Sequence, residues 1–179
     1  QAGKSAGMLP RIHANQLSRT TAVALAIELD AASADHLSAS TDADIEALAA
    51  SSTVATLLPG AEFSTQHEGK LGRRFLDRGA RVAIATDCNP GSSFTTSMPF
   101  CIAAAVSLLG FTVEEAVYAA TSGGAAALRR TDIGSFEIGA RADIAILKSP
   151  SYIHLAYRPG ADLVETTLKA GRKVKTWQK

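Results

Sequence analysis

The stretch from Arg81 to Ser92, RVAIATDCNPGS, most constrains what this chain can fold into. Val82 to Thr86 is a run of apolar, small or β-branched residues without polar alternation, which is typical of a strand buried on both faces. The run ends at Asp87, and Asn89-Pro90-Gly91 then predicts a turn. In a parallel α/β barrel, polar residues at the carboxyl ends of strands are catalytic candidates. Asp87 is therefore a candidate site residue, and the alternative is that it only caps the loop.

Composition places the chain among globular proteins that act on small molecules. Hydrophobic residues make up 46% of the 179 residues and charged residues 20%, which suits one domain or part of a larger one. The net charge is +1, with Lys and Arg scattered along the chain, so no basic surface for nucleic acid is indicated. The longest apolar run is too short to span a membrane. We therefore expect a small-molecule partner, with neither nucleic acid nor membrane involved.

The cysteines and the first residue bear on location and completeness. Cys88 and Cys101 lack the spacing of a metal knot or a disulfide framework, which favours a reducing compartment, and we expect the cytoplasm. The sequence begins at Gln1 and in mid-pattern, without Met. This start favours a piece of a longer protein, and a processed N-terminus would look the same.

Apolar strand-like runs alternate with helix-like segments in the first half of the chain. Such alternation, with strands that lack a polar face, is typical of a parallel sheet and predicts the α/β class. Pro59-Gly60 is expected to stop the third strand. The expected strands are 11–14, 34–37, 54–58 and 82–86, and the expected helices are 21–29, 42–50 and 70–78.

Three of these strands end in a titratable residue: His13, His36 and Asp87. The carboxyl ends of parallel strands meet at one edge of a sheet, so these side chains are expected to converge. Imidazole and carboxylate groups are common metal ligands and proton acceptors. Each histidine taken alone is more often a core or loop residue, and together the three favour a metal-and-base site. His67 and His154 are expected in a polar loop and a surface segment.

The sequence pattern changes in the second half of the chain. A helix is expected over 99–109, and Thr112 with Glu115 predicts a capping box for a further helix that breaks or packs tightly at Gly123-Gly124. The stretch 133–148 alternates, and 163–174 reads as a hairpin around Ala170-Gly171. We therefore expect a barrel segment over 1–131 and a small β domain over 132–179, with Arg141 and Asp143 as a structural ion pair.

Several motifs resemble those of imidazolonepropionases, which are metal-dependent amidohydrolases of histidine breakdown. The run ATDCNPGSS at 85–93 is similar to the signature of that family. Four other motifs agree with it in the same order, so that the resemblance covers essentially the whole chain. It implies the last four strands of a (β/α)8 barrel, together with strands of a small β-sandwich domain. These motifs are IHANQ (12–16), SADHL (33–37), LLPGAEF (57–63) and IGSFEIGARADIAIL (133–147).

The resemblance also implies roles for individual residues. It makes His13 and Asp87 ligands of one Zn²⁺ or Fe ion, and it makes His36 and Asp87 catalytic. It assigns substrate contacts to the positions Gln16, Asn89, Gly91 and Ser92. Cys88 departs from the Phe that is common at its position in the family, and we expect an effect on packing. The family's His-x-His ligand pair and its propionate-binding residues would precede Gln1.

The activity implied by this resemblance is hydrolysis of 4-imidazolone-5-propanoate to N-formimidoyl-L-glutamate, by an enzyme that is a homodimer at full length. The isolated fragment is expected to be inactive. Two alternatives stay open. One is another metal-dependent amidohydrolase, such as a deaminase of a nitrogen heterocycle. The other is an inactive fragment that acts only as a binding or assembly piece.

Overall fold

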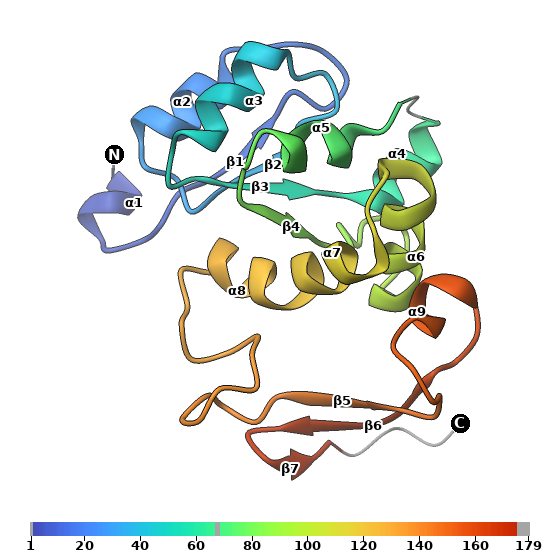
Figure 1. Cartoon of the computed structure of the whole chain (residues 1–179). Helices are drawn as coiled ribbons and strands as arrows, with labels where there is room; N and C mark the ends of the chain where they lie inside the picture. The colour runs from blue at the N-terminus through green and yellow to red at the C-terminus, as the bar shows by residue number, and fades with distance from the viewer. Residues whose placement is uncertain (1, 67–68, 175–179) are drawn as a thin grey trace.

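The computed structural model describes residues 2–66 and 69–174 and contains two separate sheets (Figure 1). The first sheet has four parallel strands that pair in the order in which they occur along the chain. This confirms the α/β class with a parallel sheet that the sequence predicts. The strands are β1 (Arg11–Ala14), β2 (Ser33–His36), β3 (Val54–Leu57) and β4 (Val82–Ile84).

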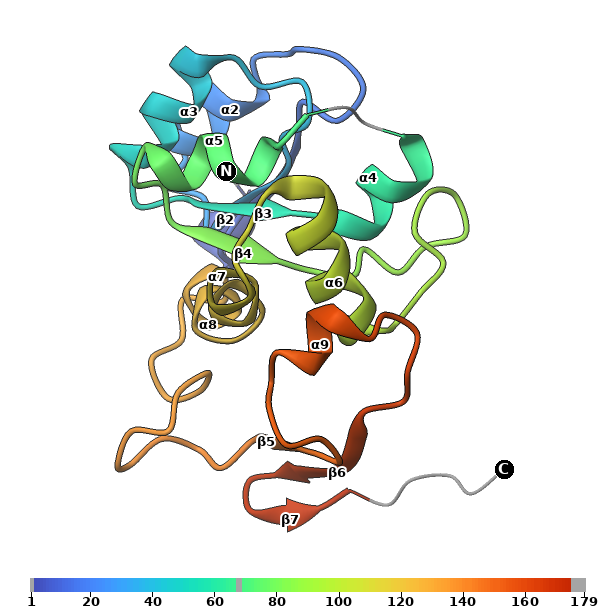
Figure 2. The same cartoon turned by 45° about the vertical axis from the view of Figure 1, so that its right-hand side comes forward.

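Short helices connect these strands and cover one face of the sheet (Figures 1 and 2). Thr41 caps α3 with a capping box, because its hydroxyl accepts from the main-chain N–H of Asp44 while the Asp44 carboxylate accepts from the main-chain N–H of Thr41. The helices of this half are α1 (Ala2–Ser5), α2 (Ala22–Glu28), α3 (Asp42–Ala49), α4 (Pro59–Thr65) and α5 (Leu71–Asp77).

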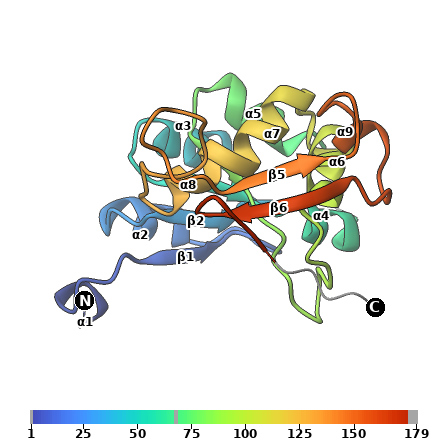
Figure 3. The same cartoon turned by 90° about the horizontal axis from the view of Figure 1, so that it is seen from below.

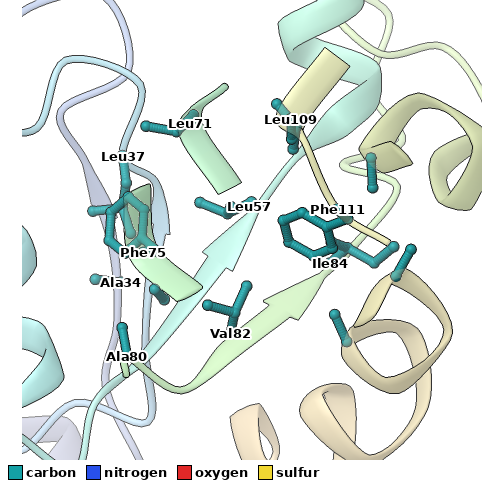
Figure 4. Packing of buried hydrophobic residues seen from close by; sticks show 14 of the residues in the cluster. Ala34, Leu37, Leu57, Leu71, Phe75, Ala80, Val82, Ile84, Leu109 and Phe111 are labelled. Carbon is teal, nitrogen blue, oxygen red and sulfur yellow. The ribbon is translucent and has the colours of Figure 1, made fainter. Parts of the chain in front are cut away.

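The main hydrophobic core lies between this sheet and its helices. Leu57 of β3, Val82 and Ile84 of β4, and Phe75 of α5 belong to one buried cluster (Figure 4). Leu57 and Phe75 are fully buried, and burying one such side chain contributes about 1.5–3 kcal/mol to stability. The sheet residues in this core point to one face of the sheet, which leaves the opposite face for a functional site.

A long helical segment follows β4 and packs against it. Its elements are α6 (Met98–Leu109), α7 (Val113–Tyr118), a π-helical turn η1 (Ala119–Gly123) and α8 (Gly124–Ala127). Gly110 ends α6 at φ +77°, and Thr112 caps α7 in the predicted capping box with Glu115. A Cβ added at Gly123 would lie 2.3 Å from the carbonyl oxygen of Val82, so only glycine lets η1 approach β4 this closely. The tight packing predicted at Gly123-Gly124 is confirmed, and the π turn that accompanies it was not foreseen.

The second sheet is small and antiparallel, and Figure 3 shows two of its strands running side by side. Its strands are β5 (Ile144–Leu147), β6 (Val164–Lys169) and β7 (Arg172–Lys173), with α9 (His154–Tyr157) between the first two. The predicted hairpin around Ala170-Gly171 is confirmed, and both residues have positive φ. Arg141 and Asp143 form the expected ion pair, with Nε 2.9 Å from Oδ2. The domain boundary between residues 131 and 132 stays a prediction.

The structure adds to or differs from the expected elements at several places. Pro59-Gly60 does not merely stop β3, because it begins α4, where proline suits the first helical turn. Strand β4 ends at Ile84, before Thr86, and only 144–147 of the alternating stretch 133–148 forms a strand. His154, expected in a surface segment, lies in the short helix α9. His67 lies outside the described residues.

Arg129, just after α8, connects segments that are far apart in the sequence. Its Nη2 group donates hydrogen bonds to Asp30 Oδ1 at 2.9 Å, to the carbonyl of Ala31 at 3.2 Å and to Ser52 Oγ at 3.1 Å. These acceptors precede β2 and β3, so this contact, the Arg129 clamp, lies at the amino ends of the strands. Among the described residues, no helix has both the length and the apolar composition needed to cross a membrane.

Candidate active site

Three side chains meet near the carboxyl ends of β1, β2 and β4. The rings of His13 and His36 lie with their centroids 4.3 Å apart and their planes inclined by 52°. Nε2 of His36 lies 3.9 Å from Oδ2 of Asp87. This separation is longer than a hydrogen bond, and it allows an ion pair only when the imidazole is protonated. The structure thus brings together His13, His36 and Asp87.

The register of the strands shows which face of the sheet carries His13. His13 pairs with Asp35 of β2, Asp35 with Thr56 of β3, and Thr56 with Ala83 of β4. Residues paired in this way point to the same face, which is opposite to the face of Leu57 and the main core. This face carries the polar residues Asp35 and Thr56 beside the apolar Ala83, and the Thr56 hydroxyl is buried without a hydrogen-bond partner among the described residues.

Left-handed backbone conformations occur where β1 and β2 end and in the segment after β4. Asn15 follows β1 at φ +48°, His36 ends β2 at φ +77° and Asp87 follows β4 at φ +49°. A non-glycine residue in this region costs about 1–2 kcal/mol, so it persists only where its surroundings hold it.

His36 is buried and His13 is exposed, so their surroundings differ. Burial lowers the pKa of His36, and the nearby charge of His13 lowers it further, while Asp87 and Asp35 act in the opposite direction. The neutral imidazole of His36 is therefore favoured at neutral pH. Its Nδ1 atom is buried and has no hydrogen-bond partner among the described residues.

The turn after Asp87 is organised by Asn89. The Asn89 side chain donates to the carbonyl oxygen of Asp87 at 2.6 Å and accepts from the main-chain N–H groups of Gly91 at 2.8 Å and Ser92 at 2.9 Å. Ser93 donates from its hydroxyl to the carbonyl of Thr86 at 2.5 Å. The polar atoms of Asn89 are thus used to shape the turn, and its predicted contact with substrate stays a prediction.

The loop after β1 carries Gln16, which is half-buried next to Asn15. Asn15 Oδ1 accepts from both the main-chain N–H of Thr20 at 2.9 Å and its hydroxyl at 2.7 Å. These bonds fix the loop that leaves β1 on the same edge of the sheet as His13. The substrate contact expected of Gln16, like those of Gly91 and Ser92, stays a prediction.

The model of the family described as "Amidohydrolase family" matches residues 12–174 of this chain. This range contains β2 to β7, all of β1 except Arg11, and every candidate site residue. The chain belongs to the amidohydrolase family. The motifs around His13 and Asp87 therefore lie within the region that this chain shares with the amidohydrolase family.

Curated relatives of this amidohydrolase carry one name. The chain is 62% identical to the imidazolonepropionase of Streptomyces avermitilis over 174 residues, which cover 97% of this chain and 42% of the relative. It is 60% identical to the imidazolonepropionase of Mycolicibacterium smegmatis over 178 residues, 99% of this chain and 44% of the relative. These similarities confirm the predicted resemblance. The chain thus spans less than half the length of either relative.

Solved structures of more distant amidohydrolases share the fold. An adenosine deaminase from Xanthomonas campestris with bound zinc matches with a TM-score of 0.76 at 21% identity, covering 96% of this chain and 46% of that one. An atrazine chlorohydrolase from Arthrobacter aurescens, complexed with zinc, matches with a TM-score of 0.77 at 17% identity, covering 97% and 45%. At these identities the likeness shows a common fold alone.

The donor atoms at the strand ends fit part of a transition-metal site. Imidazole nitrogen and carboxylate oxygen are the usual non-sulfur ligands of Zn²⁺, and His13 and Asp87 supply one of each. Within residues 2–66 and 69–174, however, no group of three or more His, Cys, Asp or Glu side chains is arranged to hold a metal ion. Catalytic zinc sites normally take three protein ligands, so these residues fit such a site in type and fall short in number.

One cavity of the molecule lies away from these residues. It has a volume of about 730 Å³ and lies between α5 and α7, lined by residues such as Leu76, Arg81 and Tyr118. Arg81 precedes β4, so this cavity is at the amino end of the strands, away from His36 and Asp87. We do not count it as part of the candidate site.

Sequence reasoning missed three polar residues that lie near the site. Asp35 contributes to the electrostatics of His36, and Ser38 forms a buried hydrogen bond with Glu62. One signal was available, because Glu62 is an acidic residue at the end of the apolar run LLPGA. The pairing itself was not readable, since Ser38 and Glu62 are 24 residues apart in the sequence.

Proposed function

We propose that this chain forms part of an enzyme that hydrolyses 4-imidazolone-5-propanoate to N-formimidoyl-L-glutamate. The observation that carries the proposal is the 62% identity to an imidazolonepropionase over 97% of the chain. The cluster of His13, His36 and Asp87 supports it, since hydrolysis of an amide-like ring bond needs an activated water and a proton acceptor.

In this proposal His13 and Asp87 hold a zinc or iron ion together with ligands from outside this chain. Such an ion would make a water nucleophile available at neutral pH, because a bound metal ion lowers the pKa of its water to about 7. The exposed position of His13 leaves its ring accessible to the metal from the open face of the sheet.

Asp87 then carries the proton, and His36 assists it. A carboxylate oxygen of Asp87 accepts a proton from the attacking water as the new C–O bond forms at the ring carbonyl carbon. The ring C–N bond breaks, and Asp87 returns the proton to the departing nitrogen. His36, whose lowered pKa keeps it neutral, orients the water or donates a hydrogen bond to the developing oxyanion.

Four further residues are proposed to contact the substrate. Gln16 lies in the loop after β1 and would contact the imidazolone ring. Gly91 has no side chain, so the substrate can approach the turn closely. Ser92 offers a hydroxyl from the same turn, and Asn89 would contact the substrate while keeping the turn in shape.

A second candidate is a deaminase of a nitrogen heterocycle. His13, His36 and Asp87 would serve it equally well, and the turn from Asn89 to Ser92 is the sequence feature that favours imidazolone hydrolysis instead. A third candidate, a binding or assembly piece, is favoured by the small number of metal ligands among the described residues. The expected homodimer and the cytoplasmic location stay predictions.

The test uses the chain alone and a chimera. The chimera joins the part of the Streptomyces avermitilis relative that precedes the matched region to Gln1 of this chain. Both are assayed for opening of the imidazolone ring, for ammonia release from a panel of nitrogen heterocycles, and for bound metal. We expect the chimera to bind about one metal ion and to open the ring, and the chain alone to do neither.

Each other outcome decides against a part of the proposal. A soluble chimera that binds metal and releases only ammonia from heterocycles would favour the deaminase. A soluble chimera without either activity would favour the assembly piece. Full ring-opening activity from the chain alone would refute the assignment of His13 and Asp87 as an incomplete ligand set.

A further inference from the structure

The segment that carries His36 has an unusual backbone. His36 and the next residue, Leu37, have φ values of +77° and +69°. Two consecutive non-glycine residues in the left-handed region are strained, so neighbouring groups must hold them. Because His36 is one of these residues, whatever holds the segment also sets the direction of its imidazole.

One side of this segment is held by the chain leaving β1. The main-chain N–H of Leu37 donates to the carbonyl of Ala14 at 2.9 Å, and that of Ala39 donates to the carbonyl of Asn15 at 2.7 Å. Leu37 is also fully buried in the main core. These contacts hold the segment on the side that faces His13. The side that faces β3 is held by a different contact.

The contact on the side of β3 is a hydrogen bond from the hydroxyl of Ser38 to the carboxylate of Glu62. Glu62 lies in the first turn of α4, directly after β3, and is 2% exposed, while Ser38 is 8% exposed. Burying a carboxylate costs several kcal/mol unless hydrogen bonds compensate for its lost hydration. The buried side chain of Glu62 therefore holds the segment after β2 in place.

We propose that Ser38 and Glu62 are positioning residues that hold the imidazole of His36 toward Asp87. This inference rests on the proposed function in so far as it concerns catalysis. Glu62 acts through Ser38, because it accepts a hydrogen bond from Ser38, two residues after His36. Without the hydrogen bond, the strained backbone at His36 and Leu37 relaxes, and the imidazole of His36 samples other directions.

The test compares Ser38→Ala and Glu62→Leu, which remove the hydrogen bond, with Glu62→Gln and Ser38→Thr, which keep an acceptor and a hydroxyl. A matched control is Ser52→Ala, since Ser52 also donates to a carboxylate, that of Asp30, at the opposite end of the strands. Each variant is made in the chimera, for kcat and KM, and in the chain alone, for the imidazole resonances of His36 by NMR.

We expect kcat to fall about 10- to 100-fold in Ser38→Ala and Glu62→Leu, with KM within about twofold, because misplacing a catalytic group by about 1 Å costs this much. Glu62→Gln and Ser38→Thr should keep kcat within about threefold of the parent. The His36 resonances should shift or broaden in the first pair and stay unchanged in Ser52→Ala.

Two results would overturn the inference. One is a Ser38→Ala protein with parental kcat and unchanged His36 resonances. The other is an equal loss of kcat in Ser38→Ala and Ser52→Ala that follows their loss of stability, which would mark the bond as purely structural. Failure of the proposed function looks different, since the parent chimera itself would then be inactive. The NMR comparison would still decide the positioning role.

Discussion

The side-chain amide of Asn89 donates a hydrogen bond of 2.6 Å to the carbonyl oxygen of Asp87. Asp87 has φ +49°, and its carboxylate faces His36 at 3.9 Å. A single asparagine thus stabilises a strained backbone conformation at the residue proposed to carry the proton. The same asparagine ties that backbone to the turn at Gly91 and Ser92.

Replacing Asn89 by alanine should lower the free energy of unfolding of the chain by about 1–2 kcal/mol, since three hydrogen bonds of a half-buried side chain are lost and water replaces them only in part. Urea unfolding measures the change. Ser92→Ala is the control, because the hydroxyl of Ser92 makes only a 3.5 Å contact with Asn89. Equal unfolding midpoints for Asn89→Ala and Ser92→Ala would contradict this account of the turn.

Gly123→Ala should destabilise the chain by about 1–3 kcal/mol, because the added methyl group would lie 2.3 Å from the carbonyl oxygen of Val82 and force η1 away from β4. The neighbouring substitution Gly124→Ala is a close control, since its methyl group would meet only the carbonyl of Ala119 at 4.0 Å. That variant should be as stable as the parent or up to about 1 kcal/mol more stable. Thermal unfolding of both distinguishes packing from helix propensity.

The two cysteines should differ in reactivity. Burial raises the pKa of the Cys101 thiol from 9.0 to about 11, and a hydrogen bond with the backbone of Gly60 opposes this shift. Cys88 is exposed. Iodoacetamide at pH 8 should therefore modify Cys88 in the folded chain, and Cys101 only after unfolding. Peptide mass mapping gives the sites, and Cys88→Ser removes the folded-state reaction.

The same shift predicts a loss of stability at high pH. The pKa of Cys101 is higher in the folded than in the unfolded state, so its contribution is complete below pH 9.0 and is lost as the pH rises through about 11. The difference in unfolding free energy between the parent and Cys101→Ala should therefore shrink between these values. A difference that stays constant from pH 8 to 11 would show that the thiol is not held protonated by burial.

Asp87→Asn should lower the turnover of the chimera by about 10²–10⁴-fold, because an amide oxygen can still bind a metal but cannot accept and return a proton. The circular dichroism spectrum should be unchanged. Asp77→Asn is the control, since that carboxylate pairs with Arg73 on the surface of α5. Turnover of Asp87→Asn within a few-fold of the parent would reduce Asp87 to a structural residue.

Much of the parallel sheet could be predicted from sequence, because its strands are continuous apolar runs that end at a polar residue or a turn. At Pro59-Gly60 the same rule correctly predicted the end of β3, and it did not predict the helix that begins there. Proline ends a strand and also suits the first turn of a helix, and only the surrounding packing selects the second outcome. The alternation over 133–148 predicted more strand than 144–147, since a strand forms only where a partner pairs with it.

At the candidate site, the meeting of His13, His36 and Asp87 followed from the order of the strands. The left-handed backbone of Leu37 and the bond between Ser38 and Glu62 could not be predicted in this way. Both depend on where β2 lies relative to α4 in space. Local sequence patterns report periodicity and turns, and they carry no information about such long-range contacts.

The Arg129 clamp also has a consequence for the order of folding. Its hydrogen bonds to Asp30 and Ser52 join residues 99 and 77 positions apart in the sequence. Contacts that close such long loops are entropically costly until the intervening strands have paired, so we expect these bonds to form after the transition state. Losing them should speed unfolding and leave the folding rate almost unchanged. Arg129 thus prolongs the lifetime of the folded sheet without helping to create it.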